Sequence, residues 1–165
     1  LLLFIIFSSH ALAKNEIVYV DFAHLLNNSQ VAKSLNQQLK AIDNKNVIEF
    51  KKIESDLKTK QQKILLQKNI IAKEEYQKIT DKFKIEFANF KSDIAKKNKD
   101  IINKKNKAEN EILLIINTIL SEYAKENSIL LILDRKSILI GKTELDITTE
   151  NIKKLDKKIK KIKLN

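Results

Sequence analysis

A single apolar stripe runs from Tyr76 to Tyr123 and restricts this chain to a few kinds of fold. Its members recur at a mean spacing of about 3.6 residues, which is the period of an α-helix. The stripe consists of Tyr76, Ile79, Phe83, Phe87, Phe90, Ile94, Lys97, Ile101, Lys105, Ala108, Ile112, Ile115, Ile119 and Tyr123. At about 1.5 Å per residue it predicts one nearly straight helix of roughly 70 Å.

A second helical pattern precedes this stripe, from Ala23 to about Leu65. Its apolar positions lie three or four residues apart, or at sums of these steps. They are Leu35, Leu39, Ile42, Phe50, Ile53, Leu57 and Ile64. The stretch from Gln67 to Lys73 interrupts the pattern without any glycine or proline, and we expect the chain to reverse there. Two long helices joined by a short turn predict an antiparallel, coiled-coil-like hairpin, an arm over residues 31–126.

Three short runs outside the arm have the composition of β-strands. Ile17–Phe22 comes first, and Ile129–Asp134 and Ser137–Ile140 follow the second helix. The last two runs are separated only by Arg135 and Lys136, which predicts two adjacent strands.

A short final helix is predicted after the turn at Gly141. Thr148 is expected to be its N-cap, Glu150 lies in its first turn, and the helix extends from Thr149 to about Lys161. Residues 14–30 and 127–165 therefore form a small β-containing body, and the fold class is mainly α. Three strands leave exposed sheet edges and little core, so we expect the sheet to be completed by further copies of the chain.

The composition excludes several classes of protein. The chain has one glycine, no proline and no cysteine. An all-β sandwich needs frequent turn residues, and a glycine-rich phosphate loop needs more than the single Gly141. Without cysteine there is no disulfide framework, thiol nucleophile or cysteine zinc site.

Catalytic chemistry has little support in the sequence. His24 lies three residues after Asp21, where the first strand meets the following helix. A metal site would need at least one more ligand, so we expect His24 to serve the local backbone. Glu74 and Glu75 are adjacent and diverge on a helix, which makes them poor acid/base partners. We therefore expect no enzyme activity, no metal and no cofactor.

The chain is strongly basic, with 32 basic and 21 acidic residues and a net charge of +11. Arg135 is its only arginine, whereas proteins that read nucleic acid favour the bidentate arginine fork. Lysines are concentrated in residues 91–107 and 153–163. These clusters are either solvated helix faces or surfaces that attract an acidic partner or anionic lipid. Nucleic acid is not an expected partner.

The first thirteen residues have the pattern of a secretory signal peptide. Leu1–Phe7 is continuously apolar, and Ala11-Leu12-Ala13 matches the cleavage motif, so we expect cleavage after Ala13. The usual basic segment before the apolar run is missing, and we interpret the signal as truncated at its start. A mature chain of residues 14–165 would act outside the cytoplasm, away from ATP and chromosomal DNA.

Three stretches carry a resemblance to a known family. They are Ile17–Leu39 (IVYVDFAHLLNNSQVAKSLNQQL), Tyr123–Ile140 with its LLILD-x-x-x-ILI pattern, and Asp146–Glu150 (DITTE) before the final helix. In this order, and together with the signal peptide, they resemble the Skp (OmpH-like) family of periplasmic chaperones for outer-membrane proteins.

The resemblance implies a homotrimer in the periplasm. Its strands would form one body, and its arms would surround a cavity that holds unfolded outer-membrane β-barrel proteins without ATP. Trimer contacts would come from Ile17, Val18, Val20, Phe22, Leu131, Leu133, Ile138 and Ile140. The client-facing residues of the arm would be Phe83, Phe87 and Phe90, and Lys96 and Lys97 would contact an anionic group.

Two other functions stay open at this point. A coiled-coil architectural protein could bind nucleic acid or an anionic envelope surface through its lysines, although an exported protein does not meet the chromosome. A periplasmic adaptor could dock one folded partner with its arms, and it would then be indifferent to unfolded chains.

Overall fold

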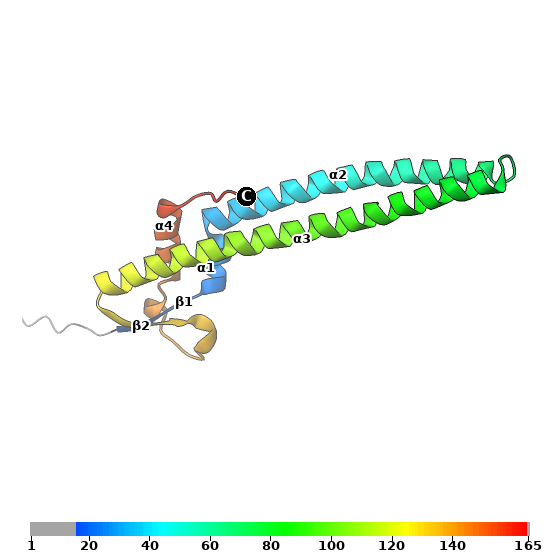
Figure 1. Ribbon diagram of the computed structural model, residues 1–165. Coiled ribbons are helices and arrows are strands. Elements are labelled where there is room, and N and C mark those ends of the chain that lie inside the picture. Colours follow the sequence, from blue (N-terminus) through cyan, green and yellow to red (C-terminus); the bar gives the residue numbers. More distant parts are fainter. Residues whose placement is uncertain (1–15, 165) are drawn as a thin grey trace, which may run out of the picture. The chain divides into compact units, whose positions relative to one another are not determined.

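The computed structural model describes residues 16–164, so the predicted signal peptide at residues 1–13 lies outside the described residues. The elements in chain order are β1 (Glu16–Val20), α1 (Phe22–Asn28), α2 (Gln30–Gln67), α3 (Lys73–Glu126), β2 (Ile129–Asp134), the 3-10 turns η1 (Arg135–Ser137) and η2 (Thr143–Leu145), and α4 (Thr148–Lys158) (Figure 1). The predicted fold class, mainly helical with a small sheet, is confirmed. Completion of the sheet by trimerisation stays a prediction.

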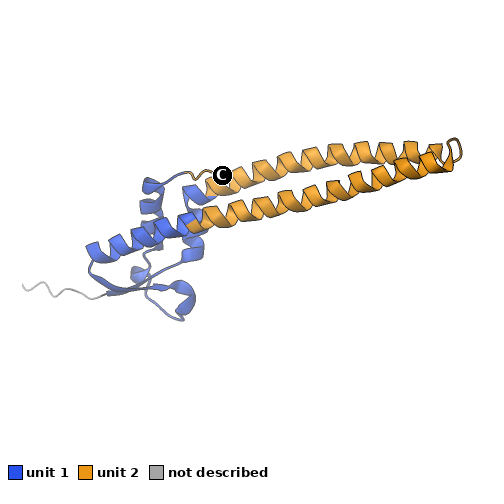
Figure 2. Ribbon diagram, in the orientation of Figure 1, with its two compact units in different colours: residues 1–32, 111–160 blue, residues 33–110, 161–165 orange. Residues whose placement is uncertain are grey.

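The chain divides into two compact units (Figure 2). Unit 1 consists of the residues up to 32 together with residues 111–160, and unit 2 consists of residues 33–110 and 161–165. The division cuts through α2 and α3, so each long helix contributes residues to both units.

Unit 2 contains the helical hairpin. Helix α2 has 38 residues and α3 has 54, and residues 68–72 reverse the chain between them. Ion pairs join the two helices from Lys60 to Glu86 and, with an Nζ–Oε2 distance of 2.6 Å, from Lys97 to Glu49. Because later residues of α2 pair with earlier residues of α3, the helices are antiparallel. The predicted reversal between Gln67 and Lys73 is confirmed.

The first predicted helix is interrupted at Ser29, which the periodicity did not indicate. The Ser29 backbone N–H donates to the Leu25 carbonyl and ends α1, and the Ser29 hydroxyl accepts from the Ala32 N–H at 3.3 Å at the start of α2. A serine hydroxyl that binds a nearby N–H offers the backbone an alternative to continuous helix. Ser29 is completely buried, so it both ends one helix and opens the next inside unit 1.

The sheet of unit 1 has two strands in the described part of the chain, and they are parallel. Ile17 pairs with Leu131 and Tyr19 with Leu133. Parallel strands need a long crossover connection, which α1, α2 and α3 together supply. On the other side of β1, the Ile147 N–H donates to the Tyr19 carbonyl at 3.0 Å.

The predicted strand at Ser137–Ile140 is wrong. The Asp134 carboxylate accepts from the Lys136 N–H at 3.1 Å, and the Ile138 N–H donates to the Arg135 carbonyl, which closes the 3-10 turn η1. This local capping turns the chain away from the sheet immediately after β2. Ile138 and Ile140 therefore lie outside the strands, and Leu139 and Ile140 are fully exposed.

The predicted N-cap of the final helix is also wrong. Thr148 is the first residue of α4, and its hydroxyl accepts from the Asp21 N–H at 2.8 Å. The Asp146 carboxylate instead accepts from the Thr148 N–H at 2.9 Å. Glu150 lies in the first turn as predicted, but the helix ends at Lys158 rather than near Lys161. Thr148 thus connects the end of β1 to the start of α4.

The core of unit 1 lies between the end of α3, α1, α4 and β1. Its buried apolar side chains are Val18, Val20, Leu25, Val31, Ala32, Ile112, Ile116, Ile119, Leu120, Tyr123, Ile147 and Leu155. Burial of each large side chain stabilises the fold by roughly 1.5–3 kcal/mol. Ile116 and Leu120 were missing from the predicted stripe, whereas Ile115 is only half-buried. The stripe therefore widens where α3 enters unit 1.

Candidate functional site

A shallow groove lies between the two helices of unit 2. Its lining comes from α2 (Glu54, Leu57, Lys58 and Gln61) and from α3 (Phe83 and Phe87), and its volume is about 260 Å³. Leu57 is buried, whereas the Phe87 side chain is 40% exposed. The groove therefore combines an apolar base with an aromatic ring that faces solvent.

The predicted arm aromatics adopt two different roles. The Phe90 ring packs edge-to-face on Phe50 of α2, with ring centroids 6.1 Å apart, and this contact holds the two helices together. Phe83 and Phe87 stack along α3 with centroids 6.2 Å apart and planes 18° apart. The structure thus brings Phe83 and Phe87 to the groove and assigns Phe90 to hairpin packing.

Positive charge lies directly beside this aromatic pair. The Lys91 ammonium is 4.6 Å from the centroid of the Phe87 ring, within the range of a cation–π interaction. Lys58 also lines the groove, and Glu54 provides a carboxylate on the same wall. Sequence reasoning missed Leu57 and Lys91 as site residues. Leu57 was on the predicted seam of the first helix, but periodicity cannot show which seam positions border an opening.

Most of the apolar seam in unit 2 is only partly covered. Residues 40–107 are all described by the structure, and among their apolar side chains only that of Leu57 is buried. Phe50, Ile53, Phe83, Phe90 and Ile94 are all half-buried. Two antiparallel helices cannot seal a stripe of this width, so apolar surface stays accessible along the hairpin.

The predicted anionic contact at Lys96 and Lys97 is partly occupied by carboxylates of the chain itself. Lys97 pairs with Glu49, and its ammonium lies 5.4 Å from the Phe50 ring centroid. Lys96 lies 4.0 Å from Asp93 in an exposed pair on the same helix. An exposed pair of this kind contributes about 0–1 kcal/mol, so Lys96 can exchange its partner readily.

Unit 1 carries a separate apolar surface. Leu139 and Ile140 are 102% and 95% exposed, and Ile17, Leu130 and Leu131 are also exposed. Val18 and Val20, by contrast, are buried inside one chain, while Phe22 and Leu133 are half-buried. Of the predicted trimer residues, Ile17, Leu131 and Ile140 are the ones whose side chains are most available to another molecule.

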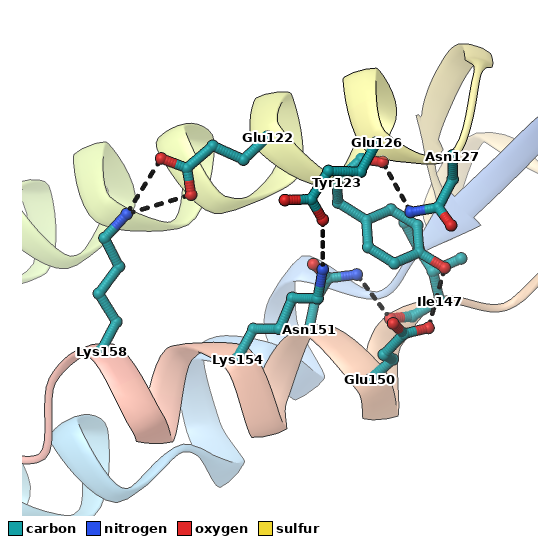
Figure 3. Close-up of polar contacts among 9 residues, drawn as sticks. All are labelled: Glu122, Tyr123, Glu126, Asn127, Ile147, Glu150, Asn151, Lys154 and Lys158. Carbon is teal, nitrogen blue, oxygen red and sulfur yellow. Dashed lines mark hydrogen bonds and ion pairs between the residues drawn. The ribbon is translucent and has the colours of Figure 1, made fainter.

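A polar network joins α4 to the end of α3 within unit 1 (Figure 3). The Tyr123 hydroxyl donates to the Glu150 carboxylate at 2.9 Å. Lys154 pairs with Glu126 at 3.1 Å and Lys158 with Glu122 at 3.3 Å, so α4 is held at both of its ends. Burial, and after it the hydrogen bond to Glu150 and the charge of Glu150, together raise the pKa of Tyr123 to about 12.

Asn151 lies beneath this network and is fully buried. Its Nδ2 donates to the Ile147 carbonyl at 2.9 Å, while its Oδ1 has no hydrogen-bond partner within residues 16–164. Sequence analysis placed Tyr123 on the apolar stripe and Glu150 in the first turn of the final helix, but it did not predict this network, because the partners lie far apart in the chain.

At the junction between β1 and α1, the Asp21 side chain binds a backbone N–H group. Its carboxylate accepts from the His24 N–H at 2.8 Å and so caps α1.

Across residues 16–164, no three histidine, aspartate or glutamate side chains are grouped as a metal site would require. None of the described helices is long and apolar enough to cross a membrane.

The elements define a class of protein with a long antiparallel helical hairpin and a small unit built around two parallel strands. The family profile for outer membrane protein (OmpH-like) matches residues 16–155. The chain therefore belongs to the OmpH-like family.

A solved structure shares this fold. It is the crystal structure of a candidate outer membrane chaperone (OmpH-like) from Caulobacter crescentus CB15. The two chains are 17% identical, with a TM-score of 0.85 over 90% of this chain and 88% of that chain. A search of curated proteins finds no match.

Proposed function

We propose that this protein is an ATP-independent holdase chaperone of the periplasm. It binds unfolded outer-membrane β-barrel proteins between the arms of a homotrimer and prevents their aggregation before membrane insertion. Membership of the OmpH-like family supports a chaperone role, and so does the fold shared with the Caulobacter protein. The single glycine of the chain supports independence from ATP, because a glycine-rich phosphate loop cannot be built.

The observation that carries this proposal is the partly covered apolar seam of unit 2. In the sequences of outer-membrane β-barrel proteins, apolar residues alternate with polar ones, and the unfolded chain exposes these apolar side chains. Half-buried aromatic and aliphatic side chains offer many weak contacts to such a chain, and none of them forms a deep pocket that would select one sequence. Several arms that act together would raise the effective concentration of these contacts.

Electrostatics support capture of acidic clients. The net charge of +11 attracts an acidic chain over long range and speeds encounter, and salt screens that attraction. Holding should therefore weaken as ionic strength rises, whereas the apolar contacts of the seam are less sensitive to salt.

The test is light scattering of an unfolded β-barrel outer-membrane protein diluted out of urea, without ATP. Residues 14–165 should suppress scattering, with saturation near one client per trimer. Phe87→Ser should raise the concentration needed for half-suppression by about threefold or more, because Phe87 faces the groove. Ile85→Ser is the matched control, since Ile85 is 63% exposed on the same helix and does not line the groove.

Three outcomes would contradict the proposal or its site. A chain shown to be trimeric that leaves scattering unchanged at low and moderate salt would favour the adaptor function. Saturable binding to one native protein, with indifference to unfolded ones, would establish that alternative. Equal losses in the Phe87 and Ile85 variants would remove the groove from the mechanism.

A further inference from the structure

The segment that follows α4 lies against the helical hairpin. Residues 161–164 belong to unit 2 together with most of α2, and the Gln38 side chain of α2 donates from its Nε2 to the Ile162 carbonyl at 2.9 Å. We call residues 161–164 the strap. The family profile matches residues 16–155, so the strap lies beyond the residues that are matched to the family.

Burial alternates along the strap. Lys161 and Lys163 are exposed, whereas the Ile162 side chain is only 7% exposed and Leu164 is half-buried. Side chains that point alternately to two sides are typical of an extended backbone, and these four residues belong to no helix or turn. The strap therefore has an apolar side that the protein covers and a basic side that faces solvent.

Few bonds hold the strap in place. Among residues 16–164, Gln38 is its only hydrogen-bond partner, and neither Lys161 nor Lys163 belongs to an ion pair. The net charge of +11 repels a basic segment, so burial of the two apolar side chains has to hold the strap. Segments with few buried contacts and exposed backbone open at a small free-energy cost compared with global unfolding.

The strap lies where the covered part of α2 gives way to the open seam. Leu35 and Leu39, on either side of Gln38 in the sequence, are both buried. From residue 40 to the end of α2, only Leu57 is a buried apolar side chain. A segment seated at Gln38 therefore lies beside the apolar surface that is available for client holding.

We propose that the strap occupies a binding site for an extended client segment, and that client displaces the strap. The site is the side of α2 next to Gln38, whose amide would donate to a client carbonyl as it donates to that of Ile162. Its ligand is a stretch of unfolded polypeptide in which apolar residues alternate with polar or acidic ones. This inference rests on the proposed holding function and adds a competitor built into the chain.

The strap itself indicates which partner fits this site. Strands of outer-membrane β-barrels are segments of about ten residues in which apolar and polar side chains alternate, and the strap has the same alternation on a shorter scale. An acidic client segment would be attracted by the net charge that repels the strap. A folded partner or a second copy would offer a rigid surface in place of one extended strand.

The first experiment measures the affinity for a model client by fluorescence anisotropy. Residues 14–165 are titrated against a fluorescein-labelled peptide of about ten residues in which valine alternates with glutamate. Ile162→Ser with Leu164→Ser should tighten binding by about threefold to tenfold, because a bound competitor lowers the apparent affinity by the fraction of sites that are open. Lys161→Ser with Lys163→Ser is the matched control on the solvent side of the strap, and it should not tighten binding.

The second experiment follows the strap itself. The chain has no tryptophan, so Leu164→Trp places a single reporter on the covered side, and Lys163→Trp is the control on the solvent side. Unlabelled peptide should shift the emission of Leu164→Trp to longer wavelength and leave that of Lys163→Trp unchanged. A peptide of the same composition, with its valines and glutamates in two separate blocks, should have little effect on either variant.

Three results would overturn the proposal. Unchanged or weaker peptide binding by the Ile162→Ser, Leu164→Ser variant would show that the strap does not compete with client. Unchanged Leu164→Trp emission at saturating peptide would show that client binds without displacing the strap. Equal tightening in the Lys161→Ser, Lys163→Ser variant would assign the effect to charge.

Failure of the strap and failure of the holding function can be told apart. If the unaltered chain suppresses aggregation of an unfolded outer-membrane protein but the strap substitutions do not tighten peptide binding, only the strap proposal is wrong. If neither the unaltered chain nor its variants bind peptide or suppress aggregation, the holding function is wrong, and the strap proposal is wrong with it.

Discussion

At the scale of single residues, side chains with a long-range hydrogen bond determine how the ends of the elements are joined. Thr148 accepts from the backbone of Asp21, and Tyr123 donates to Glu150, which lies 27 residues later. Ser128, directly before β2, adopts a left-handed backbone with φ of 54°, a conformation that serine rarely takes. Such bonds and strained turns depend on partners that local sequence does not identify.

The raised pKa of Tyr123 gives a prediction at this scale. The difference in phenolate absorbance between the unaltered chain and Tyr123→Phe should show one group that titrates near pH 12. Because the folded pKa lies above the unfolded value of about 10, the stability that Tyr123 contributes is complete below pH 10 and is lost as pH rises through 12. Between pH 10 and 12, the free energy of unfolding should therefore fall less steeply with pH in Tyr123→Phe than in the unaltered chain.

Glu150→Gln is the control for this prediction. It keeps a hydrogen-bond acceptor and removes the charge, so the pKa of Tyr123 should fall part of the way toward its usual value. A Tyr123 phenol that titrates near pH 10 in the folded chain would show that neither the burial of Tyr123 nor its contact with Glu150 forms in solution.

At the scale of elements, the two long helices of the hairpin and the strands β1 and β2 followed the sequence pattern, whereas the segment Ser137–Ile140 did not. The periodicity of α3 was visible over its whole length, because every turn repeats the same choice of apolar position. Ser137–Ile140 had strand-like composition but no partner, and the cap at Asp134 diverted it. Four residues carry too little pairing energy to resist a favourable local turn.

Docking of α4 gives a prediction at this scale. Leu155 is completely buried, so Leu155→Ala should lower the free energy of unfolding by about 2–5 kcal/mol. Leu66→Ala is the matched control, because the exposed Leu66 side chain contributes little to the folded state. Urea denaturation followed by circular dichroism measures both variants. A similar, small change in the two would mean that α4 does not pack on the rest of unit 1.

At the scale of the whole molecule, several apolar side chains of unit 1 are not covered by other parts of the same chain. Leu139 and Ile140 have no covering partner within residues 16–164, and Leu130 and Leu131 of β2 are also exposed. Exposed apolar residues at a sheet edge favour association with another molecule. This placement supports the proposed trimer, in which the edges of the small sheets would meet.

The assembly prediction concerns these exposed residues. Leu139→Ser with Ile140→Ser should change the molar mass measured by sedimentation equilibrium from that of a trimer to that of a monomer at micromolar concentration. Helix content should not change, since both side chains are fully exposed in one chain. Val20 would be a poor choice for this test, because it is buried in unit 1 and a polar substitution there would disturb folding. An unchanged molar mass would remove this segment from the interface.

The sequence by itself determined the long helices, their reversal between Gln67 and Lys73, and the strands β1 and β2. All of these depend on patterns that repeat within a few residues, so local composition is sufficient. Phe83, Phe87 and Phe90 were predicted together as client-facing residues, which stays a prediction; the structure separates them, since Phe83 and Phe87 line the groove and the Phe90 ring packs on Phe50 of the other helix.

Only the tertiary structure decided the parallel pairing of β1 with β2, the buried break at Ser29 and the attachment of α4 through Tyr123 and Thr148. It also decided which part of the apolar stripe is a sealed core in unit 1 and which part stays open in unit 2. These features depend on groups brought together from distant parts of the chain. Whether an apolar residue is core or surface is set by what covers it, and periodicity along one helix does not contain that information.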